Sequence, residues 1–199
     1  MVDTPPWLLV GLGNPEPRYA GNRHNVGFMA VDHVCDAMYP PPSWSERFKG
    51  RVTTVRVGTR RCVVLKPMTY MNRSGESAQP AAAYHRVPAE QILVLHDEID
   101  FPFGRIAVKK GGGHGGHNGL RDLIRALGTR DFIRIRIGVG RPVHGDVSDY
   151  VLSDFGADEV GELPDLLGRA RKAAEAVLTE GVRAAMNTFN RGPGEPAKN

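Results

Sequence analysis

The chain has 199 residues, a formal net charge of +4 and two cysteines. This length suits one domain with a substantial core, and the apolar and charged fractions are ordinary for a soluble globular protein. No apolar run approaches the roughly 18 residues of a membrane span and no signal peptide is visible, so we expect a cytoplasmic protein that does not enter a membrane.

The first segment of the chain predicts a strand, a polar loop and a helix. The apolar run 7–12 is typical of a buried strand and ends in a turn that carries Asn14. A polar loop with His24 follows, and apolar residues at helical spacing predict a helix over 28–38 that the prolines at 40–42 end. We therefore expect His24 just before or within the first turn of that helix, beside Asn14.

The rest of the chain alternates predicted strands with predicted helices. Strands are expected at 51–57, 62–66, 92–95, 104–109 and 132–138. Helices are expected at 74–86 with Ser74 as cap, at about 118–127, at 158–178 with a late start or a kink at Pro164, and at 182–189. This alternation predicts an α/β fold, a single domain over 1–190 with a mixed twisted β-sheet surrounded by helices. A Gly- and Pro-rich tail at 191–199 is expected to be disordered.

A glycine-rich stretch at 111–119 holds six glycines in nine positions. Glycine loses the most backbone entropy on folding, so the stretch predicts a loop, and the apolar series after it predicts a helix. A loop that enters a helix in this way brings backbone N–H groups to a ligand and leaves His117 and Asn118 at its edge. The Gly-Lys-Ser/Thr ending of a nucleotide-binding loop is missing, and His and Asn are unusual in a flexible linker.

Polar stretches follow several predicted strands at the point where each strand ends. They contain Asn14, His24, Asn25, Met71, Asn72, His96, Asp97, Glu98, His117 and Asn118. Because the carboxyl ends of strands in an α/β sheet converge on one crevice, we expect these residues to meet. No Ser or Cys stands in a nucleophile elbow, whereas a histidine oriented by a carboxylate can activate water and asparagine amides can donate to an oxyanion. The pattern predicts a hydrolase that uses neither a metal nor a covalent intermediate.

Five motifs, in order and along nearly the whole chain, resemble those of bacterial-type peptidyl-tRNA hydrolases. They lie at 11–15 (Gly-Leu-Gly-Asn-Pro), 23–25 (Arg-His-Asn), 66–75 (Lys-Pro-Met-Thr-Tyr-Met-Asn-Arg-Ser-Gly), 96–100 (His-Asp-Glu-Ile-Asp) and 111–119. This family hydrolyses the ester between a peptide and the 3′ ribose of tRNA and so recycles peptidyl-tRNA released from ribosomes. The resemblance implies this activity for a peptidyl-tRNA substrate, with no cofactor and no obligate protein partner, and we expect a monomer.

The resemblance also implies roles for individual side chains. His24 would be the general base, and Asp97 the carboxylate that holds and stabilises it. Asn14 would help distinguish blocked from free aminoacyl ends, since a carboxamide can accept a hydrogen bond from the blocked amide. Other residues of the substrate crevice would be Tyr19, Tyr70, Met71, Asn72, His117 and Asn118. The clamp on tRNA phosphate would consist of Lys109 and Arg136.

Two positions depart from the pattern that many members share. Glu16 stands where glycine is common after the Asn-Pro pair, and Asn22 stands where threonine is common before the Arg-His pair. Asparagine caps a helix as well as threonine does, so Asn22 changes little. Glu16 adds negative charge near the expected tRNA path and is expected to weaken binding there.

Simpler structural interpretations of these residues stay open. Asp97 could cap the turn after its strand, with Glu98 or Asp100 as the relevant acid. Arg134 and Arg136 could be the solvated face of a strand, because they alternate with isoleucines.

Two other functions also remain possible. A metallohydrolase could take its ligands from His96, Asp97, His114 and His117, although His-x-x-His inside a glycine loop lacks the helical scaffold that places such ligands on one face. A non-catalytic RNA-binding module would need aromatic stacking platforms, for which the basic strand offers only Phe132.

Overall fold

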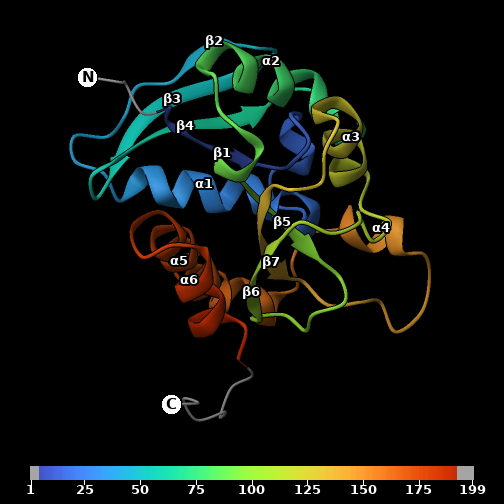
Figure 1. Ribbon diagram of the computed structural model, residues 1–199. Helices are drawn as coiled ribbons and strands as arrows, with labels where there is room; N and C mark the ends of the chain where they lie inside the picture. The colour runs from blue at the N-terminus through green and yellow to red at the C-terminus, as the bar shows by residue number, and fades with distance from the viewer. Residues whose placement is uncertain (1–4, 192–199) are drawn as a thin grey trace.

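The computed structural model describes residues 5–191, which fold around one seven-stranded sheet with helices on both faces (Figure 1). The strands are β1 (Trp7–Gly11), β2 (Ser45–Arg47), β3 (Gly50–Val57), β4 (Arg60–Pro67), β5 (Ile92–Glu98), β6 (Ile106–Lys110) and β7 (Ile133–Gly138). The α-helices are α1 (Val26–Asp36), α2 (Gly75–His85), α3 (Asn118–Leu127), α4 (Val147–Val151), α5 (Ala157–Thr179) and α6 (Val182–Phe189). Short 3-10 turns are η1 (Pro17–Tyr19), η2 (Arg23–Asn25), η3 (Met71–Arg73) and η4 (Ala89–Gln91). Within this part of the chain, no helix is both long and apolar enough to cross a membrane.

The sheet is mixed and has the strand order β2-β3-β4-β1-β5-β7-β6. β1 pairs in parallel with β4 and with β5, and β5 pairs in parallel with β7. β3 pairs antiparallel with β2 and β4, and β6 pairs antiparallel with β7. The carboxyl ends of four parallel strands therefore lie along one edge, where ligand sites of α/β sheets form. The predicted fold class, a single α/β domain with a mixed sheet surrounded by helices, is confirmed.

Two hydrophobic cores lie on opposite faces of this sheet. Alternate residues of β1 divide between them, with Leu9 in one core and Leu8 and Val10 in the other. Helices α1, α5 and α6 cover the first core, and α2 and α3 cover the second (Figure 1). β1 is thus buried on both faces, which explains its unbroken apolar run.

α1 begins so close to the sheet that the polar loop before it reaches the strand ends. A Cβ on Gly11 would lie 2.4 Å from the carbonyl oxygen of Gly27, and a Cβ on Gly27 would lie 2.3 Å from the carbonyl oxygen of Leu95. Only glycine lets two backbones approach this closely. The close packing brings η2, and His24 within it, to the carboxyl ends of β1 and β5.

Most element boundaries differ from those predicted by one or two residues, and the difference at β5 affects the site. β5 continues to Glu98, so His96 and Asp97 lie in the strand rather than after it. The apolar run stops before the strand does because the final residues of β5 are polar and line the cavity. α5 begins at Ala157 and contains Pro164, so of the late start or kink expected at this proline, the late start is wrong.

Ser74 holds the predicted N-cap position of α2, but its side chain makes no capping hydrogen bond. Ser74 already has helical backbone angles, and its hydroxyl donates to the carbonyl oxygen of Met71 at 2.7 Å. Asp122 of α3 accepts from the Gly75 N–H instead, at 2.8 Å. The first turn of α2 is therefore held by a neighbouring helix, which no local pattern could indicate.

β2 and α4 were not predicted, because both are short. β2 is three exposed residues without an apolar alternation. α4 is a single capped turn, in which Asp146 accepts from the Ser148 N–H at 2.7 Å. The tail predicted at 191–199 lies, except for Arg191, outside the described residues.

Candidate active site

A cavity of about 970 Å³ opens at the carboxyl ends of the parallel strands. Its wall contains nearly all of the side chains that the sequence singled out, namely Asn14, His24, Tyr70, Met71, Asn72, Asp97, Lys109, His117, Asn118 and Arg136. Tyr19 is not part of the wall that the described residues form, and the Arg18 guanidinium lies over its ring, 4.8 Å from the centroid. α4 contributes apolar side chains to the wall through Val147 and Val151.

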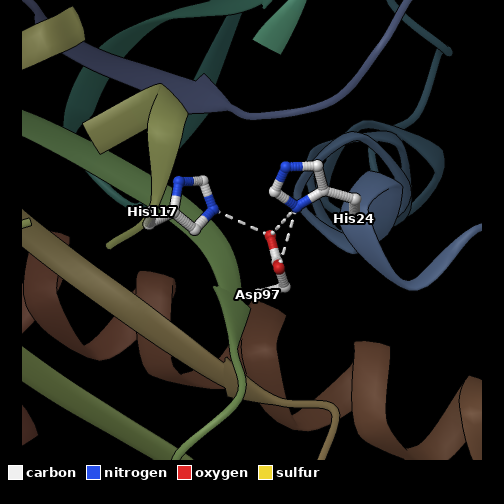
Figure 2. Close-up of side chains that lie close together, drawn as sticks. All are labelled: His24, Asp97 and His117. Atoms are coloured by element: carbon white, nitrogen blue, oxygen red, sulfur yellow. Dashed lines mark hydrogen bonds and ion pairs between the residues drawn. The ribbon is translucent and has the colours of Figure 1, made fainter. Parts of the chain in front are cut away.

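Three side chains from separate elements form a hydrogen-bonded cluster (Figure 2). His24 comes from η2, Asp97 from β5, and His117 from the end of the glycine loop. His24 Nδ1 lies 2.9 Å from each carboxylate oxygen of Asp97, and His117 Nε2 lies 2.8 Å from one of them. Asp97 is only 3% exposed. A carboxylate buried to this degree needs hydrogen-bond donors, and the two imidazoles supply them.

The start of α3 determines which nitrogen of His117 carries the proton. His117 is the N-cap residue, and its Nδ1 accepts from the backbone N–H groups of Gly119 (3.1 Å) and Leu120 (3.3 Å). An accepting nitrogen has no proton, so the proton is on Nε2, which donates to Asp97. The sequence placed the cap at Asn118 or a neighbour, and the neighbour His117 holds that position.

His24 takes the opposite tautomer. Its Nδ1–H donates to Asp97, which leaves a lone pair on Nε2. Nε2 lies on the side of the ring that points away from the carboxylate (Figure 2). Because His24 also lines the cavity, this neutral imidazole can accept a proton from a molecule bound there.

Burial and hydrogen bonding shift the charge states of the cluster in opposite directions. Burial alone would lower the pKa of His24, but the adjacent Asp97 carboxylate outweighs it and raises that pKa above the ordinary 6.5. Burial alone would raise the pKa of Asp97, but the imidazoles of His24 and His117 hold it well below its usual range. Burial and the nearby His117 lower the pKa of His96 to about 3. At neutral pH, Asp97 is therefore ionised and His96 is neutral.

The donor chemistry of the cluster does not suit a metal ion. His24, Asp97 and His117 offer ligand atoms within 4.8 Å of one another. However, His117 Nε2 could bind a metal only by losing its proton, and Nδ1 cannot take that proton while it accepts from the first amides of α3. In the metallohydrolase alternative, His114 Nδ1 accepts from the Gly116 N–H, and His96 Nδ1 donates to the Asp97 carbonyl oxygen, which leaves His96 Nε2 without a partner among the described residues. The hydrogen bonds of His117 favour proton transfer over metal ligation in the cluster.

Asn14 presents a hydrogen-bond donor to the cavity rather than an acceptor. Its Oδ1 accepts from the Met71 N–H at 2.8 Å. Its backbone is held by Asn25, whose Oδ1 accepts from the Asn14 N–H and whose Nδ2 donates to the Asn14 carbonyl oxygen, both at 2.9 Å. Among the described residues, no partner accepts from Asn14 Nδ2. The side chain therefore offers its NH₂ group, which complements a carbonyl oxygen or an oxyanion.

Two further amides line the same cavity. Asn118 Oδ1 accepts from Arg121 Nη1 at 3.0 Å, and this hydrogen bond leaves the Asn118 NH₂ group available to donate to a ligand. Asn72, in η3, is exposed. Together with Asn14, these residues place three carboxamides in the wall of the cavity that His24 lines.

Basic side chains form another part of the wall. Arg136 Nε donates to Glu98 at 2.9 Å, and its guanidinium lies over the Phe101 ring, 4.2 Å from the centroid. The Lys109 ammonium makes no hydrogen bond or ion pair with another described residue, although the backbone of Lys109 pairs with β7. The remaining N–H groups of Arg136 and the ammonium of Lys109 can therefore meet an anionic ligand.

Arg134 is not on a solvated strand face, and that expectation is wrong. The residue is 3% exposed, and its guanidinium donates to the carbonyl oxygens of Gly113 (2.6 Å) and Gly112 (2.5 Å). The glycine loop folds over this face of β7 and buries it. Phe132 is completely buried as well, so it cannot be the stacking platform that an RNA-binding module would need.

The two departures from the family pattern have local partners. The Tyr70 hydroxyl donates to Glu16, and Arg18 forms an ion pair with Glu16 at 2.9 Å. The extra negative charge at Glu16 is therefore matched by Arg18. Asn22 does not cap the helix, since its Nδ2 donates to Asp154 at 2.7 Å.

Three features of this site had no role predicted from the sequence. Asn25 holds the backbone of Asn14, and its position directly after His24 was the available signal. Arg134 orders the glycine loop, and its alternation with isoleucines gave no signal of this contact. The α4 side of the cavity had no signal at all, because a five-residue helix leaves no periodic pattern.

Comparison with known proteins points in one direction. A family model described as peptidyl-tRNA hydrolase matches residues 8–198. The chain is 49% identical over 194 residues to a peptidyl-tRNA hydrolase of Sorangium cellulosum (96% of this chain, 86% of the relative) and 46% identical over 183 residues to one of Geobacter sulfurreducens (92% and 94%). The fold is similar to the crystal structure of peptidyl-tRNA hydrolase from Acinetobacter baumannii, with a TM-score of 0.86 and 37% identity over 94% of this chain and 95% of that one. The matched region includes the entire cavity wall and all of the sheet except Trp7.

Proposed function

Because the chain belongs to the peptidyl-tRNA hydrolase family, we propose that it hydrolyses the ester that joins a peptide to the 3′ oxygen of tRNA. One observation carries the mechanism. The buried carboxylate of Asp97 holds the Nδ1–H of His24, which leaves Nε2 as a free acceptor at the cavity. This is the arrangement that a general base requires.

The reaction follows from that geometry. His24 Nε2 accepts a proton from a water molecule as the water oxygen attacks the ester carbonyl carbon. Asp97 stabilises the imidazolium that forms, and the carbonyl oxygen becomes an oxyanion within reach of amide donors. The tetrahedral intermediate then breaks its bond to the 3′ oxygen, which takes the proton back from His24. The products are the free peptide and tRNA with a 3′ hydroxyl.

Water is the nucleophile that the surroundings support. The thiols of Cys35 and Cys62 lie in the core, where burial raises their pKa to about 12 and about 11, so neither is a thiolate. Two hydroxyls, those of Tyr70 and Ser148, line the cavity. In the described part of the chain neither is hydrogen-bonded to a histidine that could activate it.

The remaining groups of the wall bind the substrate. The NH₂ groups of Asn14, Asn72 and Asn118 donate to the oxyanion or to the peptide carbonyl oxygens. Lys109 and Arg136 neutralise tRNA phosphate. All of these residues come from one chain, so a monomer is sufficient for the reaction. The substrate is a by-product of translation, so the reaction takes place in the cytoplasm.

The proposal is tested by incubating the protein with N-acetyl-aminoacyl-tRNA and with free aminoacyl-tRNA, each with a chelator present. Rapid release of the blocked amino acid, with the free ester left intact, is the expected result. Failure to cleave the blocked ester would reject the function. Activity that disappears after exhaustive chelation would support a metallohydrolase instead.

Asn14→Asp is expected to lower the ratio of blocked to free substrate cleavage by about tenfold or more, the effect of a hydrogen bond to a charged group. The Asn14 NH₂ group donates to a peptide carbonyl, whereas a free α-ammonium has only donors and leaves this group unpaired. An aspartate would reverse the preference, because it attracts the ammonium. Asn187→Asp makes the same change at an exposed asparagine of α6 outside the cavity and serves as the control. If both rates fall equally in Asn14→Asp, Asn14 positions the substrate but does not discriminate.

A Lys109→Ala/Arg136→Ala variant is expected to bind tRNA more weakly and to lose roughly one to two units of the slope of log affinity against log salt, since each phosphate contact contributes about 0.7–0.9. KM for full-length substrate should rise more than kcat falls, because binding is lost equally from ground and transition states. A substrate reduced to the terminal nucleotides should be cleaved normally. Arg125→Ala removes an exposed arginine outside the cavity and is the control. Equal losses on both substrates would reject the clamp.

A further inference from the structure

Arg23 directly precedes His24 in η2, yet its side chain is buried and is not part of the cavity wall. Its Nη1 donates to Ser153 Oγ at 2.7 Å and to the Asp154 carbonyl oxygen at 2.6 Å. Its Nη2 forms an ion pair with Glu159 at 2.5 Å. One guanidinium therefore connects η2 to the segment between α4 and α5 and to the first turn of α5.

Backbone hydrogen bonds join the same two segments. The Arg23 N–H donates to the Ser153 carbonyl oxygen at 3.1 Å, and the Phe155 N–H donates to the Gly21 carbonyl oxygen at 3.4 Å. The Arg23 guanidinium also lies over the Tyr150 ring, 4.3 Å from the centroid. Tyr150 belongs to α4, whose other side chains line the cavity. η2 is thus fastened to the element that forms one wall of the site.

Stability alone does not account for this arrangement. Removing both charges of an ion pair from water offsets much of their attraction, so apolar side chains of similar size would serve the fold as well. What the planar guanidinium provides is orientation, because its donors are fixed relative to one another and each contact restricts the same group. The group that this restricts most directly is the next residue, His24.

We propose that Arg23 is a positioning residue for His24, which holds η2 against the segment after α4 so that the imidazole meets Asp97 and faces the cavity. This inference rests on the proposed role of His24 as general base. Lysine at this position could keep the ion pair with Glu159. It could not donate to Ser153 and Asp154 at the same time or stack on Tyr150.

Arg23→Lys is therefore expected to lower kcat by about 10- to 100-fold while KM changes by less than about twofold, since small misplacements of a catalytic group have effects of this size. The increase of kcat/KM with pH should also move to lower pH. The titratable groups that contact the His24 imidazole are Asp97 and His117, and a looser contact with Asp97 favours the neutral form. Arg125→Lys, an exposed arginine that pairs with Asp122, is the matched control and should change neither quantity.

The decisive readout is the nitrogen-15 NMR titration of the His24 ring, which does not depend on turnover. In Arg23→Lys the His24 pKa should fall together with kcat. A variant that melts at a lower temperature but keeps both the His24 titration and kcat overturns the proposal, because Arg23 then only stabilises the fold. Where Arg23→Lys does not fold, Ser153→Ala removes one acceptor and should shift both quantities in the same direction by less; no shift would overturn the proposal. If the wild-type protein cleaves no peptidyl-tRNA, the proposed function fails, whereas the effect of Arg23 on the titration is still measured.

Discussion

Replacing His24 with alanine is expected to lower kcat for N-acetyl-aminoacyl-tRNA by about 10²–10⁴-fold, the range that a positioned general base contributes. His24 Nε2 is the free acceptor of the cluster, because the single proton of His117 is on the nitrogen that donates to Asp97 and its other nitrogen caps α3. His117 therefore cannot substitute for His24 in the variant. Residual activity should come from the amide donors alone.

The same variant should keep its affinity for tRNA, since the proposed phosphate contacts are on β6 and β7 rather than on η2. Binding is measured with uncharged tRNA, and folding with the thermal unfolding midpoint. A His24→Ala protein that is folded, binds tRNA and retains near-normal kcat would show that another group removes the proton.

Asp97→Asn is expected to lower kcat strongly, although by less than the loss of His24. The carboxylate accepts from two imidazoles, His24 Nδ1–H and His117 Nε2–H. An asparagine has one acceptor oxygen for these two donors, and its NH₂ group would oppose one of them. It would also carry no charge to stabilise the imidazolium that forms as the proton is taken up.

The pH dependence separates this effect from a structural one. The Asp97 carboxylate raises the pKa of His24, so in Asp97→Asn the increase of kcat/KM with pH should occur at lower pH. Asp32→Asn makes the same change at a carboxylate that pairs with Lys66 outside the cavity and should leave the profile unchanged. An unchanged profile in Asp97→Asn would mean that Asp97 holds the structure together without acting on His24.

The position of the site could be predicted from the sequence because it depends on sheet topology. Asn14 follows β1, Tyr70 follows β4, and Asp97 is the last residue but one of β5, and parallel strands bring such ends together. His24 joins them because Gly11 and Gly27 allow α1 to begin against the sheet. Each of these positions has a signal in the sequence nearby. The signal is either a polar residue at the end of a strand or a glycine where the helix approaches the sheet.

The direction of the hydrogen bonds could not be predicted, because it depends on partners far away in the chain. The carboxamide of Asn14 was expected to accept a hydrogen bond from the substrate. Its oxygen is instead occupied by the Met71 N–H, and this leaves the NH₂ group for the substrate. Arg134 was expected to be solvated, but the glycine loop that follows β6 covers it, about twenty residues away in the chain. Neither contact is indicated by the residues that lie next to Asn14 or Arg134 in the sequence.

The most direct test of the mechanism compares two titrations of the wild-type protein. One is the pKa of the His24 ring measured by nitrogen-15 NMR, and the other is the pH at which kcat/KM for N-acetyl-aminoacyl-tRNA reaches half of its plateau. A general base must be neutral to accept a proton, so kcat/KM should rise with pH, and its midpoint should coincide with the His24 pKa, above the ordinary value of about 6.5. His24 would not be the base if its ring titrates at one pH while kcat/KM changes at another. The same conclusion would follow if kcat/KM falls as His24 loses its proton.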